Sequence, residues 1–309
     1  MDESNARPAL SVIVVSYNMA REIPRTIRSL SCLMQAGLSE QDYEIILVDN
    51  GSAIPFDADL CRSVAGNLRL ISLKNVGKSP ARAINTGIME ARGDLIGVFI
   101  DGARLASPGL LRAALDASRV HPKPVIGSLA FHLGPDVQSK SVILGYSQEV
   151  EDRLLEEAGW LDDGYRLFDI SVFAGSSRDG WFVIPAETNA VFLTRPHWRE
   201  LGGYDERFES PGGGLANLDL WARACESRDG QIIQLLGEAT FHQVHGGVST
   251  NSAESKWRAF HDEYVKIRGR SYVRPSGDPL LFGSLKHVGH GSLAASLDSL
   301  RERRQPDEK

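Results

Sequence analysis

Short apolar runs typical of β-strands alternate with helical patterns over residues 10–120. The strand-like runs are Leu10 to Val15, Tyr43 to Val48, Leu68 to Leu73 and Leu95 to Ile100. The helical patterns are Ile23 to Leu33, Ala81 to Ala91, and Pro108 to Ser118 with Ser107 as its expected cap. Strand–helix alternation at this spacing predicts a parallel sheet covered by helices. We therefore expect an α/β fold: a single large domain with a mostly parallel sheet flanked by helices.

The pattern changes after a further strand predicted at Val125 to Phe131. Residues 132–185 are rich in Gly, Asp and Ser, and they predict an irregular stretch of the kind that is usually functional or mobile. Its aromatic side chains, Trp160 and Trp181 among them, suit either a core or sugar stacking. Beyond it, strands are expected at 190–194, 232–236 and 240–242, and helices from Pro196, near Leu218 and over 252–268.

Composition and charge exclude several classes of protein. The net charge of −6 argues against a dedicated nucleic-acid binder, which would carry a basic face. The three cysteines are far apart and odd in number, which favours reduced thiols over a disulfide framework. The first eight residues lack an apolar signal core, and no apolar run reaches the roughly 18 residues that span a bilayer. We expect a cytoplasmic protein, with peripheral contact to an inner membrane as the alternative.

Two acidic residues follow predicted strands directly. Asp101 comes after the run that ends at Ile100, and Asp49 opens the turn-like sequence Asp49 to Ser52 after the second strand. Open α/β sheets bind ligands at the carboxyl ends of their strands. Asp101 is therefore a candidate metal or ligand contact, or a polar residue that caps the next segment. Asp49 is a candidate contact to a base or ribose, or merely part of a turn.

The segment Lys74 to Lys78 follows the third strand and opens a helix. Backbone N–H groups at a helix N-terminus attract anions, and Lys78 and Arg82 add positive charge. The segment predicts a phosphate-binding loop, with an ordinary solvated helix start as the alternative.

Two histidines lie close together near the predicted strand at 240–242. His242 and His245 precede a Gly pair, and either could complete a metal shell with Asp101. Oxygen ligands suit Mg²⁺ and Mn²⁺, and Mn²⁺ also accepts imidazole. A lone histidine is more often structural, and Arg104 is an alternative source of the positive charge that a metal would supply.

A glycine-rich loop, Gly212 to Gly214, runs into the helix near Leu218. Glycines let a backbone approach a ligand closely. Asn217 is a candidate cap for that helix. Asp219 is a candidate general base, or a first-turn carboxylate favoured by the helix dipole.

Taken in order, these segments resemble the family 2 glycosyltransferases, which have the GT-A fold with a Rossmann-like sheet. The resemblance rests on a set of motifs that together span most of residues 10–265. They are SVIVVSYN from Ser11, EIILVDNGS from Glu44, NVGKSPARAINTGIMEARGDLIGVFID from Asn75, residues 189–194, GGYDERF from Gly202, and residues 242–249.

The resemblance implies inverting transfer of a sugar from a nucleotide donor to an acceptor hydroxyl. It implies a donor-binding half over residues 10–125 and an acceptor-binding and catalytic half over 126–270. Residues 1–9 would be disordered, and the tail 271–309 partly helical. The donor pocket would be formed by Ser16, Tyr17, Asp49, Asn75, Gly77, Arg82, Asp101 and Arg104. A divalent metal, Mn²⁺ or Mg²⁺, would be held by Asp101 with His242 or His245.

The chain departs from the family pattern at two positions. Ala103 stands where the second carboxylate of the metal motif is expected, and Ala216-Asn217 stands where the family has a Glu-Asp pair. Because Asn cannot accept a proton at neutral pH, the base would be another residue. The candidates are Asp219, Glu187 and Glu209.

These departures keep two other readings open. One is a catalytically silent protein with the same fold that binds a nucleotide sugar or a partner protein. The other is a nucleotidyltransferase, which is disfavoured because Ser16 to Asn18 contains no glycine. For a transferase, a UDP-sugar is the default donor, and a bacterial surface glycan or glycolipid the expected acceptor. Any membrane contact would be peripheral, through the amphipathic tail.

Overall fold

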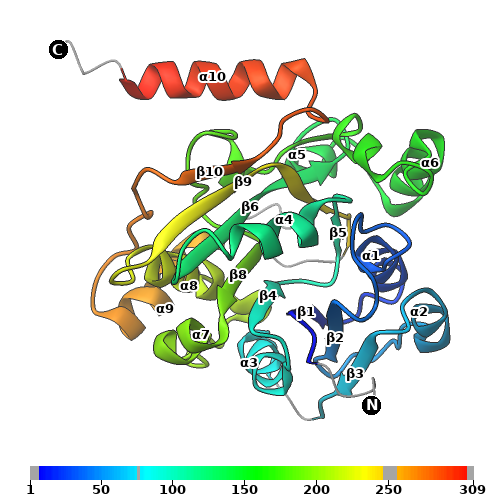
Figure 1. Ribbon diagram of the computed structural model, residues 1–309, viewed down its shortest axis with the longest axis horizontal. Coiled ribbons are helices and arrows are strands. Elements are labelled where there is room, and N and C mark those ends of the chain that lie inside the picture. Colours follow the sequence, from blue (N-terminus) through cyan, green and yellow to red (C-terminus); the bar gives the residue numbers. More distant parts are fainter. Residues whose placement is uncertain (1–6, 75–76, 246–255, 305–309) are drawn as a thin grey trace.

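The computed structural model describes residues 7–74, 77–245 and 256–304. The strands form one mixed sheet in the order β10–β9–β6–β8–β4–β1–β2–β3 (Figure 1). Two short strands join it outside this order: β5 pairs with β9, and β7 pairs with β6. Their bounds are β1 Leu10–Ser16, β2 Tyr43–Asp49, β3 Leu68–Ser72, β4 Leu95–Phe99, β5 Arg104–Ala106, β6 Pro124–Leu133, β7 Ser171–Phe173, β8 Ala190–Thr194, β9 Gln231–His242 and β10 Leu280–Gly283.

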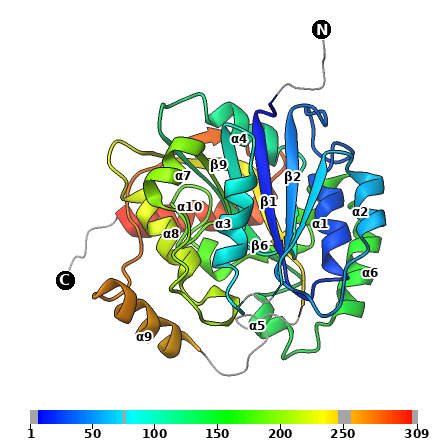
Figure 2. The same cartoon turned by 90° about the horizontal axis from the view of Figure 1, so that it is seen from below.

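Helices lie on both sides of this sheet, as Figures 1 and 2 show from two directions. They are α1 Glu22–Leu30, α2 Ala58–Val64, α3 Ala81–Glu90, α4 Leu110–Ala117, α5 Gln138–Ser141, α6 Gln148–Ala158, α7 Arg195–Leu201, α8 Ala216–Cys225, α9 Trp257–Arg268 and α10 His290–Arg304. The expected α/β fold with a mostly parallel sheet is confirmed.

Strand direction decides which side chains meet. β1 runs parallel to β2 and β4, and β2 runs parallel to β3. β8 is antiparallel to both β4 and β6, so the direction reverses twice and β6 points the same way as β4. β9 is parallel to β6. The carboxyl ends of β1, β2, β4 and β9 therefore lie along the same edge of the sheet.

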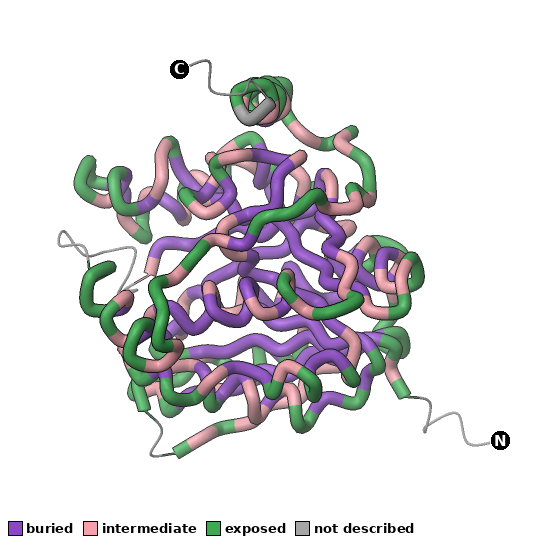
Figure 3. Tube along the Cα trace, turned by 90° about the vertical axis from the view of Figure 1, so that its left-hand side faces the viewer, coloured by how far each residue is buried: buried purple, intermediate pink, exposed green. Residues whose placement is uncertain are grey.

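Two apolar clusters cover the two faces of the sheet. On one face α1, α2 and α4 contribute buried residues such as Ile27 and Leu111. On the other face α3, α7, α8 and α9 contribute residues such as Trp198 and Trp221. Figure 3 shows the strands as a buried centre with exposed segments outside, which is expected of parallel strands buried on both faces.

A third cluster, rich in aromatic side chains, lies beside β6 and β9. Phe131, Phe168 and Phe241 contact one another there, with ring centroids 4.9–5.6 Å apart. Trp160 and Trp181 belong to the same cluster and are buried. The alternative left open by the sequence is thereby decided, because buried indoles are unable to stack on a sugar ring.

The segment 132–185 is more regular than its composition predicts. It contains α5, α6 and β7, and α6 begins at a Ser147 cap whose Oγ accepts from the Val150 N–H. Low hydrophobicity concealed this helix, because only a narrow stripe around Leu155 faces the core.

Other boundaries also differ from prediction. The two strands expected between residues 232 and 242 form one strand, β9, with Gly237 at a positive φ of 72° and a shift of register opposite Gly127 to Leu129. The prediction of Ser107 as a helix cap was wrong. α4 starts at Leu110, and the Ser107 Oγ instead donates to Glu238 Oε2 at 2.5 Å. None of the helices within the described ranges combines the length and apolar character needed to span a bilayer.

Candidate active site at the carboxyl edge of the sheet

Asp101, Arg104 and His242 meet because of how β4, β5 and β9 are paired. The chain leaves β4 at Phe99, turns through Asp101, and enters β5. β5 is antiparallel to the end of β9, and in that register Arg104 lies opposite His242. His242, 138 positions after Arg104 in the sequence, is thus brought beside both Arg104 and Asp101.

The side chains of this cluster converge on one carboxylate oxygen. Asp101 Oδ2 lies 3.0 Å from Arg104 Nε and 3.5 Å from His242 Nε2. His242 Nε2 lies 3.2 Å from His245 Nε2. One ligand atom from each of Asp101, His242 and His245 falls within 4.8 Å of the others. The three predicted metal ligands are therefore assembled.

The electrostatics of the cluster suit ligand binding. Burial would raise the pKa of Asp101, but the neighbouring Arg104 guanidinium holds that pKa well below its ordinary value. Burial, reinforced by Arg104, lowers the pKa of His242 to about 4. At neutral pH Asp101 is an anion and His242 is a neutral imidazole, which is the form that ligates metals.

One carboxylate and two imidazoles form a donor set that Mn²⁺ accepts. The cluster thus fits a divalent cation, although Arg104 already supplies one positive charge at Asp101. Ala103 adds no ligand: it is fully buried in the apolar cluster around α1. Its backbone N–H donates to Asp101 Oδ1 at 2.9 Å, which orients that carboxylate.

Three candidate donor contacts lie at the ends of β1 and β2. Ser16 and Asp49 are register partners. The Ser16 Oγ is buried and has no hydrogen-bond partner within the described part of the chain. Tyr17 is 45% exposed. Asp49 Oδ1 accepts from the Ser52 backbone and hydroxyl, so the predicted turn is present and Asp49 is held at its start.

The candidate phosphate loop lies beside that turn. Asn50 Nδ2 donates to the carbonyls of Gly77 and Ser79, both at 3.3 Å. The Gly212 N–H donates to the Lys78 carbonyl at 3.2 Å, which joins the glycine-rich loop to the same segment. Gly77 and Arg82 are exposed. Asn75 lies outside the described residues.

Glu187 and Asn217 form a pair near the Asp101 cluster. Asn217 Nδ2 donates to Glu187 Oε2 at 2.9 Å, and Asn217 Oδ1 accepts from Tyr204 Oη at 3.1 Å. Burial raises the pKa of Glu187, and the charges of Arg104 and Asp101 both act on it. The structure therefore brings Glu187 to the same site. Asn217 lies within α8 and is not its cap, which is Leu215.

Asp219 is placed elsewhere. It is buried, and both of its oxygens are engaged: Oδ2 with Arg223 at 2.8 Å, and Oδ1 with Arg268 at 2.5 Å. The position suits a structural role, which is the alternative that the sequence analysis gave for it. Glu209, the third candidate, is exposed, and its backbone N–H bonds to Glu263.

Sequence reasoning missed the residues that surround the histidines. Gln138 lies 2.6 Å from His242 Nδ1, and Glu151 accepts the Val244 N–H at 2.8 Å. Both come from the segment predicted to be irregular. A glutamine and a glutamate in a polar stretch give no local signal, because their role depends on contacts about 100 residues away.

Comparisons with known proteins show the family and the fold of the chain. Residues 11–173, more than half of the chain, match the sequence model described as Glycosyl transferase family 2. The chain is 27% identical over 217 residues to validoxylamine A glucosyltransferase of Streptomyces hygroscopicus subsp. jinggangensis, covering 67% of this chain and 49% of that protein. It is 33% identical over 123 residues to the uncharacterized glycosyltransferase EpsJ of Bacillus subtilis, covering 39% and 33%.

Among solved structures, S. aureus TarS 1–349 in complex with UDP-GlcNAc matches with a TM-score of 0.51 at 15% identity, covering 83% of this chain and 66% of that chain. This likeness shows the GT-A fold. The chain spans about half or less of the length of the two curated relatives it matches. On the family match, the chain belongs to glycosyl transferase family 2.

Proposed function

We propose that this protein transfers a sugar from a nucleoside diphosphate sugar to an acceptor hydroxyl, with inversion at the anomeric carbon. The observation that carries the proposal is the convergence of Ser16, Asp49, Asp101 and Glu187 toward one edge of the sheet. Such an edge is where open α/β sheets bind ligands. Family membership supports the same reaction class.

The donor is bound at the ends of β1, β2 and β4. The buried Ser16 hydroxyl and Asp49 face the nucleoside, and Gly77 and Arg82 line the same pocket. A UDP-sugar is the first donor to test, since the TarS complex with UDP-GlcNAc has the same fold. A bacterial surface glycan or glycolipid is the proposed acceptor class.

The diphosphate lies beside Asp101, Arg104 and the two histidines. Asp101, His242 and His245 would hold a divalent metal, which would neutralise the charge that develops on the leaving diphosphate. The Arg104 Nη1 is buried and has no hydrogen-bond partner within the described residues. Arg104 thus has a donor to offer a phosphate oxygen, which adds to the same stabilisation.

Glu187 is the proposed general base. It takes the proton from the acceptor hydroxyl while that oxygen attacks the anomeric carbon. The bond between that carbon and the diphosphate oxygen breaks, and its electron pair leaves with the diphosphate. Asn217 holds Glu187 Oε2 through a single hydrogen bond and leaves Oε1 for the acceptor.

The test is turnover of a panel of nucleotide sugars, with and without Mn²⁺, measured as nucleotide release and as glycosylated product. Asp101→Asn is expected to lower turnover by about 100-fold or more, because the anionic ligand of the metal that would neutralise the diphosphate is lost. Asp59→Asn is the matched control, since Asp59 is a solvent-exposed carboxylate on α2. The anomeric configuration of the product, read by NMR, tests inversion.

The silent alternative keeps one specific observation in its favour: Ala103 and Asn217 replace two acidic positions of the family pattern. Suppose that the protein binds donors but releases nucleotide from none of them, and that Asp101→Asn leaves the donor affinity unchanged. This result would establish that alternative and overturn the proposal.

A further inference from the structure

The segment between β6 and β7 contacts the two histidines at separate points. Gln138 of α5 reaches His242, and Glu151 of α6 reaches the backbone just before His245. Both side chains are fully buried. Buried polar groups are costly unless they are hydrogen-bonded, so the partners of these two residues are informative.

Gln138 makes two bonds to one residue, and these fix how it is oriented. Its Nε2 donates to the His242 carbonyl at 3.1 Å. A carbonyl only accepts, so the amide nitrogen must face it and Oε1 must face the ring. Oε1 lies 2.6 Å from His242 Nδ1. Because an amide oxygen only accepts, His242 must carry its proton on Nδ1.

This protonation state has a consequence at the other ring nitrogen. With the proton on Nδ1, the Nε2 of neutral His242 presents a lone pair toward Asp101 Oδ2 and His245. That is the tautomer a metal ligand needs. The backbone N–H of Gln138 also donates to His132 Nδ1 at 2.9 Å, which fixes the start of α5 beside the site.

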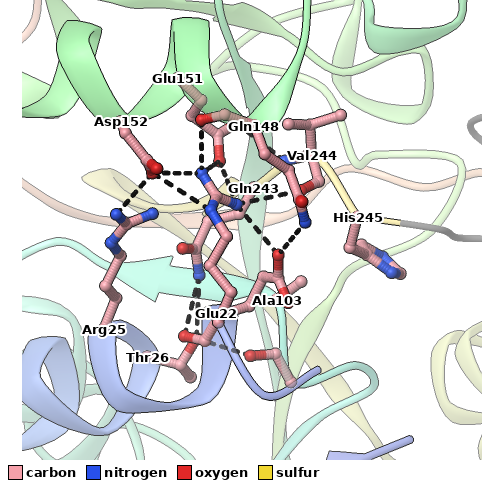
Figure 4. Close-up of polar contacts among 12 residues, drawn as sticks. Glu22, Arg25, Thr26, Ala103, Gln148, Glu151, Asp152, Gln243, Val244 and His245 are labelled. Carbon is pink, nitrogen blue, oxygen red and sulfur yellow. Dashed lines mark hydrogen bonds and ion pairs between the residues drawn. The ribbon is translucent and has the colours of Figure 1, made fainter. Parts of the chain in front are cut away.

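Glu151 acts on the other histidine through the backbone. The Val244 N–H donates to Glu151 Oε2 at 2.8 Å, and the Val244 carbonyl accepts from Arg21 Nη1 at 3.2 Å. Glu151 and Arg21 are themselves an ion pair at 3.2 Å. The pair therefore holds both polar groups of Val244, the residue that precedes His245 (Figure 4).

The contacts of the adjacent residue, Asp152, differ from those of Glu151. Asp152 pairs with Arg21 and Arg25, both at 2.6 Å, and already ties α6 to α1 at the surface. Figure 4 shows Asp152 on the Arg25 side of α6 and Glu151 on the Val244 side, with His245 beyond it. The buried carboxylate of Glu151 is thus directed at Val244, the residue that precedes His245.

We infer that Gln138 and Glu151 are positioning residues for the metal site: Gln138 sets the tautomer of His242, and Glu151 with Arg21 fixes the backbone that carries His245. The inference rests on the proposed function, since it concerns the same histidines. Groups that orient ligating histidines typically change metal affinity by about 10–100-fold when removed.

The test uses Mn²⁺ alone as the probe, with its affinity measured by calorimetry or by electron paramagnetic resonance. Gln138→Leu and Glu151→Gln are each expected to weaken Mn²⁺ binding by about tenfold or more. Gln138→Glu is expected to retain binding, because one carboxyl oxygen still accepts the hydrogen bond from Nδ1–H, and the other, when protonated, donates to the His242 carbonyl. Glu157→Gln is the matched control for Glu151→Gln, since Glu157 is an exposed glutamate of the same helix, and it is expected to bind Mn²⁺ as the unmodified protein does.

Unmodified affinity in both Gln138→Leu and Glu151→Gln would overturn the inference and leave the metal assignment standing. Absence of Mn²⁺ binding to the unmodified protein would overturn both the inference and the metal assignment. Turnover without metal would still support the proposed transferase. Thermal unfolding monitors folding of each variant. If Glu151→Gln does not fold, the contrast between Gln138→Leu and Gln138→Glu decides, because loss in both variants contradicts the tautomer argument.

Discussion

At the scale of single residues, the site depends on which side of the chain each group faces. Asp101 faces the edge of the sheet, whereas Ala103 is buried among apolar side chains of α1 and its neighbours. A carboxylate at position 103 would be buried without a partner, at a cost of several kcal/mol. The apolar surroundings of position 103 therefore suit Ala103 better than the second acid of the metal motif. Arg104, at the next position, supplies positive charge beside Asp101.

The first prediction concerns Glu187. Glu187→Gln is expected to lower kcat by about 10²–10⁴-fold, because the proposed base is lost. A carboxyl whose pKa is raised by burial becomes protonated as the pH falls through that raised value. In the unmodified enzyme kcat/KM should therefore decline on the acid side at a pH above the ordinary range of glutamate, and this acid limb should be absent in the residual activity of the variant.

Glu209→Gln is the control for that measurement, since Glu209 is an exposed glutamate on the adjoining loop. Loss of activity in Glu209→Gln with retention in Glu187→Gln would transfer the role of base to Glu209.

At the scale of elements, α8 and α9 are joined by charged groups as well as by apolar packing. Arg268, at the end of α9, contacts Asp219 of α8 and also Asp205 at 3.0 Å. Phe208 lies 5.7 Å under the same guanidinium. Asp219, which the sequence offers as a candidate general base, thus holds one helix against another. Helix geometry explains this, because Asp219 points about 200° away from Asn217.

The second prediction follows from that packing. Asp219→Asn is expected to lower the free energy of unfolding by about 3 kcal/mol, because two partly buried guanidiniums lose a buried charge partner. Donor affinity should change little, since the site residues are untouched. Urea unfolding and nucleotide binding measure the two effects. Asp298→Asn, which breaks an exposed pair on α10, is the control and should cost less than about 1 kcal/mol. Lost turnover with unchanged stability would contradict the structural role.

The third prediction concerns pH and the same junction. Hydrogen bonds from Arg207, with help from Arg268, lower the pKa of Asp205 to about 2. A carboxyl with a lowered folded pKa stabilises the fold above its unfolded pKa of about 3.9, and that contribution is lost as the pH falls through about 2. Asp205→Asn should therefore cost about 1–2 kcal/mol near neutral pH, discounted because Arg207 is largely exposed.

Urea unfolding over a series of pH values measures that difference. The gap between Asp205→Asn and the unmodified protein should close as the pH falls below the ordinary range of aspartate. A gap independent of pH would show that the effect of the substitution is steric.

At the scale of the whole molecule, the site joins segments that are distant in sequence. The turn after β4, the end of β9 and the segment after β9 supply the candidate ligands, and α5 and α6 contact them from a third direction. A cation bound there would connect the first half of the domain to the second.

The fourth prediction follows from this connection. Mn²⁺ at about 100 times its dissociation constant should raise the free energy of unfolding by about 2.7 kcal/mol, because it binds the folded state alone. Thermal unfolding with and without Mn²⁺ measures the effect. His245→Ala should remove most of it, and His121→Ala, which alters a histidine outside the site, should not. An equal Mn²⁺ effect in His245→Ala would remove His245 from the ligand set.

By itself, the sequence determined the strands β1 to β4, the helices α1 and α3 between them, and the candidate positions Asp49, Asp101 and His242. These follow from local patterns, because apolar periodicity and strand-end polar residues lie within short windows of the chain. The sequence did not reveal α6, whose apolar stripe is narrow, or the single long strand β9.

Only the tertiary structure decided which of the candidate acids lie together. Strand order brought His242 opposite Arg104, and helix orientation turned Asp219 toward Arg268 and away from Asn217. The same packing gave Gln138 and Glu151 their partners. Such roles depend on contacts between residues far apart in the chain, and a residue's local pattern carries no record of the group it will meet after folding.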